Sequence, residues 1–340
     1  MKKMFRYILV IFILFRSSLA LSQFVFAKYA GAFMRSGVGA RPLGLGGAYV
    51  AACEDVTSIY WNPAGLTSMK TFQIHGMHAE RFSGIINWDF VGIGIPFNKN
   101  AAMGFGFFRM GIDGIPITAI RDLSRDLGER YIDEEGKWIE NDVFVEKYIN
   151  DHEMAFIFSF AKKQSDRLSY GGNVKVIRKR AGEYGAWGLG FDCGILWKPY
   201  RAFQVGLVLL DGSSTLIAWN GGRKELIAPH IKMGVAYPLW ISHFHILPVF
   251  DIHVGFENQR STAQISIGKA NLDFQGGFEI GFNNRVAIRM GSDRGYLTAG
   301  IGLGISAFQV DYSFSRHFDL GETHRISATF FWDKYRLVQF

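Results

Sequence analysis

Apolar side chains recur at every second position through most of the chain beyond residue 70. In residues 308–315 the apolar positions hold Phe, Val, Tyr and Phe, and the positions between them hold Gln, Asp and Ser. The same alternation runs through residues 187–197, 231–239, 244–257 and 297–303. A period of two places alternate side chains on opposite faces of an extended chain, so it is a strand signal and not a helix signal. The sequence therefore predicts an all-β protein.

This alternation fits two architectures, a soluble sandwich and a transmembrane barrel. Two details favour the barrel. Many of the positions between the apolar ones hold Gly, Asp, Lys or Arg, as a barrel lumen allows. Aromatic residues also end the apolar stripes, as with Trp187 and Trp197, whose spacing of ten residues suits a membrane-spanning strand of about 9–11 residues. The predicted fold class is a transmembrane antiparallel β-barrel.

The runs can be counted, and the connections between them fall into two classes. Fourteen runs are predicted as strands: 71–80, 88–97, 101–111, 152–162, 168–180, 184–197, 202–210, 229–239, 244–257, 261–282, 285–292, 296–305, 306–315 and 323–332. A change of phase near Lys269 predicts a β-bulge within the tenth run. An even number of strands, with long connections such as 112–151 and 211–228 on one side and short ones on the other, is the pattern of outer-membrane barrels. The long connections are expected outside the cell.

The basic charge of the chain lies mostly in its first twenty residues. Lys2, Lys3, Arg6 and Arg16 supply four of the seven net positive charges, and they flank a short apolar run. Such a segment is typical of a cleaved signal peptide, here residues 1–20 with cleavage near Ala20 or Ser22, rather than of an uncleaved anchor. The remaining chain is nearly balanced, so nucleic acid is not expected as a partner.

Residues 23–69 lack the alternation and are rich in glycine, which makes up 40 of the 340 residues of the chain. Small residues permit close approach between backbones. Residues 23–69 are therefore predicted to be a hatch, or plug, inside a barrel formed by residues 70–340; a periplasmic arm is the alternative. The candidate hatch and gating residues are Gly44, Gly46, Gly47, Asn62, Pro63, Ala64 and Gly65.

Strand parity also predicts which charged side chains face the lumen. These candidates are Lys175, Asp192, Lys232, Asp251, Asp273, Glu279, Arg285, Arg289, Asp311 and Arg325. Their mixed signs indicate internal ion pairs and plug contacts, or simple solvation of the wall, rather than an ion filter of one sign. Cys193 falls on the lipid-facing stripe and Cys53 precedes the first strand, so both are expected to be free.

The sequence contains no recognised catalytic motif, and its histidines are poorly spaced for a metal. His245 and His253 are separated by about 26 Å if both lie on one strand. No metal site, cofactor or enzymatic activity is predicted.

Three stretches carry a resemblance to a known family: Gly39–Ala51 (GARPLGLGGAYVA), Tyr60–Leu66 (YWNPAGL) and Asp311–Phe331 (DYSFSRHFDLGETHRISATFF). At these residues the chain resembles the PorV/PorQ family of bacterial outer-membrane proteins, relatives of the FadL-type hydrophobe transporters. The resemblance implies a fourteen-stranded barrel with a short N-terminal hatch, to which Asn62, Pro63 and Ala64 would belong. Two features depart from the family: the long loop 112–150, which could form a surface cap or binding element, and the continuation of the chain to Phe340.

The resemblance implies a non-enzymatic barrel of the bacterial outer membrane, in contact with its lipid. The main functional prediction is a barrel associated with type IX secretion that binds exported protein cargo or secretion-system subunits. The alternative is a FadL-like transporter of long-chain fatty acids or other hydrophobic compounds. A structural barrel without small-molecule cargo is the second alternative.

Overall fold

The computed structural model describes residues 25–26, 30–81, 84–256, 263–268, 270–283, 285–317 and 321–332. The predictions for the signal peptide, for Lys269 and for Phe340 lie outside these residues. Within them, no helix is both long and apolar enough to cross a membrane.

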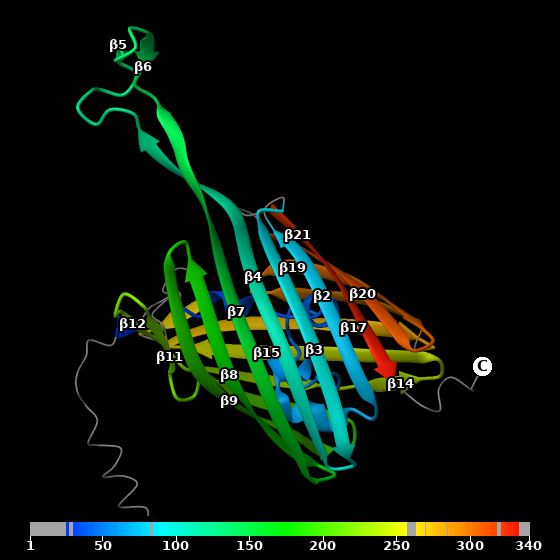
Figure 1. The fold of residues 1–340 in the computed structure, drawn as a ribbon. Coiled ribbons are helices and arrows are strands. Elements are labelled where there is room, and N and C mark those ends of the chain that lie inside the picture. Colours follow the sequence, from blue (N-terminus) through cyan, green and yellow to red (C-terminus); the bar gives the residue numbers. More distant parts are fainter. Residues whose placement is uncertain are drawn as a thin grey trace, which may run out of the picture.

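Fourteen antiparallel strands close into a barrel, which confirms the predicted fold class (Figure 1). The barrel closes because the first strand, β2, pairs with the last, β21, from Phe72 opposite Trp332 to Glu80 opposite His324. In order around the wall the strands are β2 (Phe72–Arg81), β3 (Ile86–Asn98), β4 (Ala101–Ile120), β7 (Val143–Ser165), β8 (Leu168–Ala181), β9 (Tyr184–Tyr200), β10 (Phe203–Leu210), β13 (His230–Ala236), β15 (Phe244–Gly255), β17 (Ala270–Phe282), β18 (Val286–Asp293), β19 (Tyr296–Ile305), β20 (Phe308–His317) and β21 (Gly321–Trp332).

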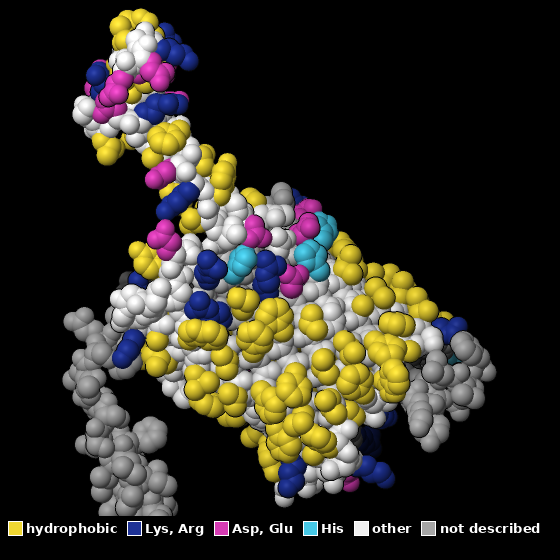
Figure 2. Space-filling view, in the orientation of Figure 1, with side chains coloured by type: hydrophobic (Ala, Val, Ile, Leu, Met, Phe, Trp, Pro, Cys, Tyr) yellow, Lys and Arg dark blue, Asp and Glu magenta, His cyan; other side chains and the backbone are white. Residues whose placement is uncertain are grey.

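The alternation seen in the sequence becomes the two faces of this wall. In β9 the outward Trp187, Leu189 and Phe191 are 57%, 49% and 44% exposed, whereas Asp192 on the inner face is buried. Apolar side chains gather over the outside of the strands (Figure 2). A closed barrel with an apolar exterior satisfies all backbone hydrogen bonds within its wall, which is what the interior of a bilayer requires.

Two of the strands extend far beyond the rim as a separate arm, visible at the top of Figure 1. The predicted strands 101–111 and 152–162 were too short, because β4 and β7 continue to pair as far as Ile120 opposite Val143. At the tip, β5 (Arg130–Ile132) pairs with β6 (Trp138–Glu140). Apolar side chains of the arm follow one another without strict alternation with polar ones, as in Ile115-Pro116-Ile117 and Val143-Phe144-Val145, so the period of two did not mark these residues as strand.

The predicted tenth strand, 261–282, is wrong as a single element. Its first part is β16 (Ile265–Ile267), which folds back and pairs antiparallel with the start of β17, with Ile267 opposite Ala270. The break between β16 and β17 falls where the alternation of the sequence changes phase.

Between β10 and β13, which pair from Gln204 opposite Ala236 to Leu210 opposite His230, the chain makes an excursion at the end of the wall. After Leu210 the chain passes through Asp211 and Ser214, both with positive φ, before it forms β11 (Thr215–Trp219) and β12 (Lys224–Ile227). Among the described residues, β12 pairs with β11 and, in parallel, with β1 (Val25–Phe26), but not with β15. The short β14 (Leu239–Ile241) pairs with β15 at the other end of the barrel.

Residues 30–69 form four short helices: η1 (Ala32–Ser36), α2 (Ala40–Gly44), α3 (Ser58–Trp61) and η2 (Pro63–Ser68). We call residues 30–69 the lumen segment, because they lie inside the ring of strands (Figure 1).

Candidate functional site: the filled lumen

The lumen segment contacts strands on several sides of the barrel. The amide of Ala40 donates to Ser327 Oγ of β21 over 3.0 Å, and Asn62 Nδ2 donates to the carbonyl of Ile195 in β9 over 3.0 Å. Its large side chains Leu45, Tyr49 and Ile59 are fully buried. These contacts place the segment in the lumen. The predicted outer limits of a hatch, at residues 23 and 69, stay a prediction.

The motif Asn62-Pro63-Ala64-Gly65 is the point at which α3 ends and η2 begins. Asn62 Oδ1 accepts from the amide of Ala64 over 3.1 Å and caps η2, while Pro63 occupies its first turn. Asn62 Nδ2 donates to the carbonyls of Val50 and Ile195, both over 3.0 Å. Gly65 donates its amide to the carbonyl of Asn62 over 2.9 Å. One fully buried asparagine thus joins a helix start, another part of the segment and the wall.

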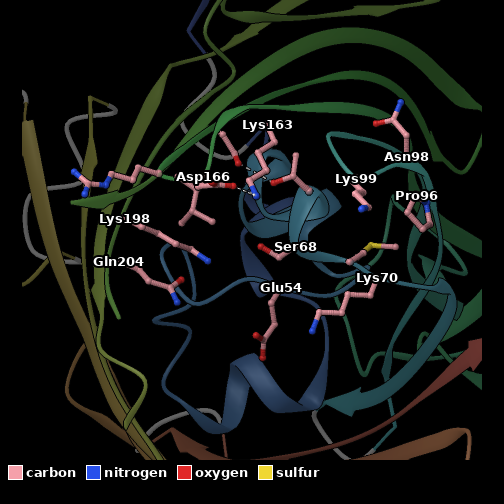
Figure 3. A pocket seen from close by; sticks show the side chains of 15 residues that line it. Glu54, Ser68, Lys70, Pro96, Asn98, Lys99, Lys163, Asp166, Lys198 and Gln204 are labelled. Carbon is pink, nitrogen blue, oxygen red and sulfur yellow. Dashed lines mark hydrogen bonds and ion pairs between the residues drawn. The ribbon is translucent and has the colours of Figure 1, made fainter. Parts of the chain in front are cut away.

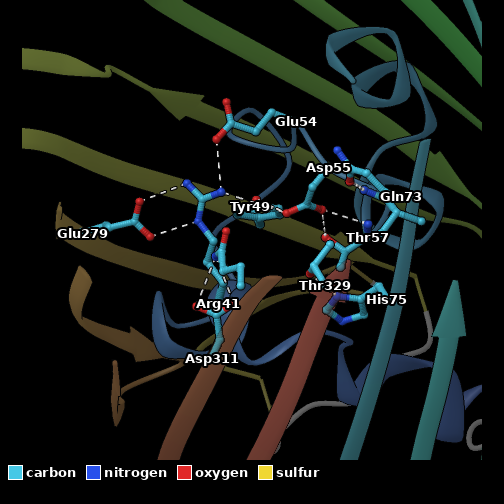
Figure 4. A network of polar contacts seen from close by, with 12 residues as sticks. Arg41, Tyr49, Glu54, Asp55, Thr57, Gln73, His75, Glu279, Asp311 and Thr329 are labelled. Atoms are coloured by element: carbon cyan, nitrogen blue, oxygen red, sulfur yellow. Dashed lines mark hydrogen bonds and ion pairs between the residues drawn. The ribbon is translucent and has the colours of Figure 1, made fainter. Parts of the chain in front are cut away.

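Arg41 is the centre of an ion-pair network between the segment and the wall (Figure 4). Its guanidinium forms a bidentate contact with the carboxylate of Glu279 in β17, with Nε 2.9 Å and Nη2 3.0 Å from the two oxygens. Arg289 of β18 reaches the same carboxylate over 2.5 Å and Asp311 of β20 over 2.7 Å. Arg41 also contacts Glu54 over 3.1 Å. Burial alone would lower the pKa of Arg41, but Glu279 reverses this and raises the pKa well above its ordinary value.

A second ion cluster lies in the wall on β8, β9 and the end of β10. Lys175 Nζ is 2.6 Å from both Asp192 and Asp211. Asn173 beside it donates to Asp192 over 3.0 Å and to the carbonyl of Ile59 over 3.0 Å. The wall cluster therefore also holds the lumen segment.

Asp251 of β15 holds the middle of the segment. One carboxylate oxygen accepts from the amides of Tyr49 and Val50, over 2.9 and 3.0 Å. Lys232 of β13 lies with its ammonium 5.1 Å from the centroid of the Trp61 ring. Both residues were predicted to face the lumen, and both contact the segment or lie against it.

The remaining lumen candidates have various surroundings. Asp273 is buried and accepts from the amide of Gln264 over 3.0 Å, and Arg325 is buried and donates to Ser315 over 2.9 Å. Arg285 is a correction: it lies in the turn between β17 and β18 and is exposed, because the strand begins only at Val286.

Glycines of the segment and of the wall meet where their backbones touch. A Cβ added to Gly291 of β18 would lie 2.5 Å from the amide nitrogen of Gly46. Gly46 itself has a φ of 72°, and a Cβ there would collide with the carbonyl of Ser292. The neighbouring carbonyl of Gly44 accepts from Thr298 of β19 over 3.1 Å, and the amide of Gly47 donates to the carbonyl of Pro42 over 3.0 Å. Only glycine permits this spacing.

The structure also bears on reactive groups. Cys53 and Cys193 are both free, as predicted, and burial raises the pKa of the Cys53 thiol. His245 lies 3.7 Å from Glu279 as part of the network around Arg41. In the part of the chain that the structure describes, no group of three or more His, Cys, Asp or Glu side chains could hold a metal.

Sequence reasoning missed Arg41, Asp211, Asn173 and Glu54. Asp211 follows a strand end and Asn173 is uncharged, so parity of charged residues could not find them. Arg41 could have been found, because it is the only charged residue between Ser36 and Cys53 and would lie in a buried segment. Such a charge requires a partner of opposite sign.

Two cavities lie on opposite sides of the lumen segment. The one toward the arm has a volume of about 40 Å³ and is lined by Ile59 and Tyr60 and by the charged Lys175, Asp211 and Lys232. The other, at the end with the short turns, has a volume of about 630 Å³ and is bounded by residues 67–69 of the lumen segment and by Lys70, which follows it. The segment thus stands between them.

Comparison with solved structures shows what this fold is similar to. The Ralstonia pickettii toluene transporter TbuX superposes with a TM-score of 0.55 at 12% identity, covering 87% of this chain and 99% of that one. A Pseudomonas aeruginosa FadL homologue gives 0.54 at 11% identity, covering 88% and 100%. The CymD monoaromatic hydrocarbon channel gives 0.55 at 12% identity, covering 92% and 100%. The fold is therefore that of a FadL-like barrel.

No protein-family model matches the sequence, and no curated protein matches it. The finer resemblance to PorV/PorQ has no support from these comparisons.

Proposed function

We propose that this chain is an outer-membrane channel that passes hydrophobic or amphipathic small molecules across the membrane when its lumen segment shifts. The observation that carries the proposal is the filled lumen: a segment docked by separate polar contacts divides the interior into two cavities. A similar barrel fold in transporters of toluene and monoaromatic hydrocarbons supports the same assignment. The secretion-associated role predicted from the sequence finds no such support.

The cavity on the arm side cannot hold such a molecule in this conformation. Its volume of about 40 Å³ suits one or two water molecules, and charged groups line it. Beside it the pairing of β13 with β15 ends at His230 opposite Gly255, where both strands end. We place the route from the membrane beyond these two strand ends. Movement of the lumen segment away from Ile227, which Gly31 touches, would widen the cavity toward it.

The proposal is tested by locking the segment to the wall. Ala40 and Ser327 touch across this interface, so the double variant Ala40→Cys and Ser327→Cys can form a disulfide in a background without the two native cysteines. The variant is produced in a Gram-negative host that lacks its own long-chain fatty-acid transporter, and uptake of radiolabelled toluene and oleate is measured. We expect uptake above the empty-vector level, lost on oxidation and restored by a reductant.

The matched control places the same bridge in the arm. Arg130 and Glu140 are opposite each other in β5 and β6, so Arg130→Cys with Glu140→Cys adds a disulfide without touching the lumen. Oxidation of this control should leave uptake unchanged. Uptake no faster than with the empty vector would contradict the channel, and uptake unaffected by the Ala40–Ser327 lock would contradict movement of the segment.

A further inference from the structure

The larger cavity lies at the end of the barrel where the turns are short. Three consecutive hairpins of the wall, β3–β4, β7–β8 and β9–β10, surround it, and residues 67–69 of the lumen segment, with Lys70 after them, form its floor (Figure 3). We call this cavity the vestibule. Its volume of about 630 Å³ is within the range of small-molecule sites, about 300–1,000 Å³.

Basic side chains dominate the vestibule. It is lined by five basic residues, Lys70, Lys99, Lys163, Arg167 and Lys198, and by two acidic ones, Glu54 and Asp166. Both acidic residues already have partners: Glu54 contacts Arg41 over 3.1 Å, and Asp166 contacts Lys163 over 2.8 Å. Among the described residues, Lys70, Lys99, Arg167 and Lys198 have no carboxylate partner. Four cationic groups thus surround one cavity with their charge uncompensated.

Between these cations the vestibule is partly apolar. Met69 and Leu196 line it and are 6% and 3% exposed, and Pro96 lies on its rim. Thr67 and Ser169, hydroxyl to hydroxyl at 2.9 Å, fix the floor to β8. On the side of the lumen segment that faces away from the vestibule, Val56, Ile59 and Leu66 are fully buried. The vestibule is therefore closed toward the lumen.

From this arrangement we infer that the vestibule is a binding site for an organic anion: an anionic head among Lys70, Lys99 and Lys198, and an apolar body against Met69 and Leu196. Lysine acts as a point-charge partner for carboxylate or phosphate, and apolar lining with a few charged groups is the usual composition of a ligand site. A neutral hydrocarbon would offer these lysines no partner of opposite charge. The inference goes beyond the proposed channel, because it concerns equilibrium binding and requires no passage.

The test measures binding directly on the full chain in lipid nanodiscs, by calorimetric titration with octanoate and with 1-octanol as the neutral probe of equal length. Empty nanodiscs provide the blank. We expect octanoate to bind with an affinity that falls as salt rises, and 1-octanol to bind about tenfold more weakly or not at all.

The decisive variant is Lys99→Gln with Lys198→Gln, which removes two cations near the strand ends. Its octanoate affinity should fall about tenfold or more. The matched control is Lys147→Gln with Lys162→Gln, which changes the net charge equally but at exposed positions outside the vestibule, and which should bind normally. Equal affinity of the wild type for octanoate and 1-octanol, equal loss in the two double variants, or no loss in the first would each overturn the inference.

The anion could be a soluble compound or the headgroup of an anionic lipid. Titrations in discs of phosphatidylcholine and of phosphatidylglycerol separate the two at an ionic strength that screens the charge of the lipid surface, because a lipid occupant would then still weaken octanoate binding in the second. Since the readout is binding, a chain that fails to transport but binds octanoate would contradict the proposed channel alone. A chain that transports but does not bind would contradict the vestibule alone.

Discussion

The lumen segment and the arm are two stretches of nearly equal length that lie outside the alternating pattern of the barrel, yet they differ in almost every physical respect. Residues 30–69 contain four charged residues, and residues 113–151 contain sixteen, eleven of them acidic. The segment buries Leu45, Tyr49 and Ile59 completely, whereas the arm exposes Leu123 and Trp138 by 88% and 67%.

An ion pair of the same kind is expected to contribute more to stability in the lumen than in the arm. Arg41–Glu279 in the lumen and Arg121–Asp142 in the arm are both arginine–carboxylate pairs. Arg41 and Glu279 are 12% and 5% exposed, but Arg121 and Asp142 are 46% and 54% exposed. Water screens the arm pair, whereas a lone charge in the lumen has no solvent to replace its partner.

The largest expected effect tests this contrast directly. Glu279→Gln leaves Arg41 and Arg289 buried without their shared carboxylate, so the free energy of unfolding should fall by about 3–5 kcal/mol. Asp142→Asn in the arm removes the equivalent charge and should cost about 0–1 kcal/mol. Urea unfolding in lipid vesicles, followed by tryptophan fluorescence, measures both. Equal losses in the two variants would mean that burial does not set the strength of these pairs.

A smaller effect is expected from packing between segment and wall. Gly291→Ala puts a methyl group 2.5 Å from the amide of Gly46, and the overpacking should lower the free energy of unfolding by about 1–3 kcal/mol. Gly76→Ala in β2 is the matched control, since its added methyl group meets nothing within 4 Å. It should be neutral or stabilise by about 0.4–1 kcal/mol. If Gly76→Ala also lowered the free energy of unfolding, the loss in Gly291→Ala would come from replacing a glycine within a strand and not from its contact with Gly46.

The arm and the lumen segment each contain a fully buried asparagine, Asn141 and Asn62. Asn141 fixes the arm tip, because its Nδ2 donates to the carbonyls of Asp122, Arg125 and Asp126 over 2.9, 3.0 and 3.2 Å. Asn62 does the same in the lumen but also bonds the wall. Asn62→Ala should lower the free energy of global unfolding by about 1–3 kcal/mol.

Asn141→Ala should instead open the tip locally, with faster tryptic cleavage at Arg125 and Arg130 and a global unfolding free energy within about 0.5 kcal/mol of the wild type. Limited proteolysis and urea unfolding of both variants measure this. Rapid cleavage in the barrel of Asn141→Ala, or none at the tip, would show that the arm does not open independently.

Most of the wall could be predicted from the sequence, because burial on one face and lipid on the other impose a period of two. The runs 184–197 and 296–305 match β9 and β19 closely. The same parity found Glu279, Arg289 and Lys175, since a charge on an inward position of such a strand must lie in the lumen. Parity gave the wrong position for Arg285, because this residue lies in the turn before β18 begins at Val286.

What could not be predicted depends on contacts between residues distant in the chain. The partner of Glu279 is Arg41, 238 positions earlier and in a stretch with no period. The docking of Asn62 on Ile195 likewise follows from the closed barrel and from no local pattern. The strands of the arm were missed for a different reason: residues 113–120 and 143–150 pair with each other outside the ring of strands, and their apolar side chains do not strictly alternate with polar ones.

The smallest expected effect follows from that lack of packing. Beyond Gly111 and Asp151, β4 and β7 pair with no other wall strand, and the bond that Asn150 accepts from the amide of Gly182 over 3.0 Å lies outside the part removed here. The removed part therefore contributes mainly its own pairing. Replacing residues 117–147 with Asn-Gly joins Pro116 to Tyr148, which are opposite each other, through a two-residue turn. We expect a change of less than about 0.5 kcal/mol in the free energy of unfolding, because only exposed pairs such as Lys147–Glu183 are lost. A loss of several kcal/mol would show that the arm stabilises the barrel and would remove the contrast with the lumen segment.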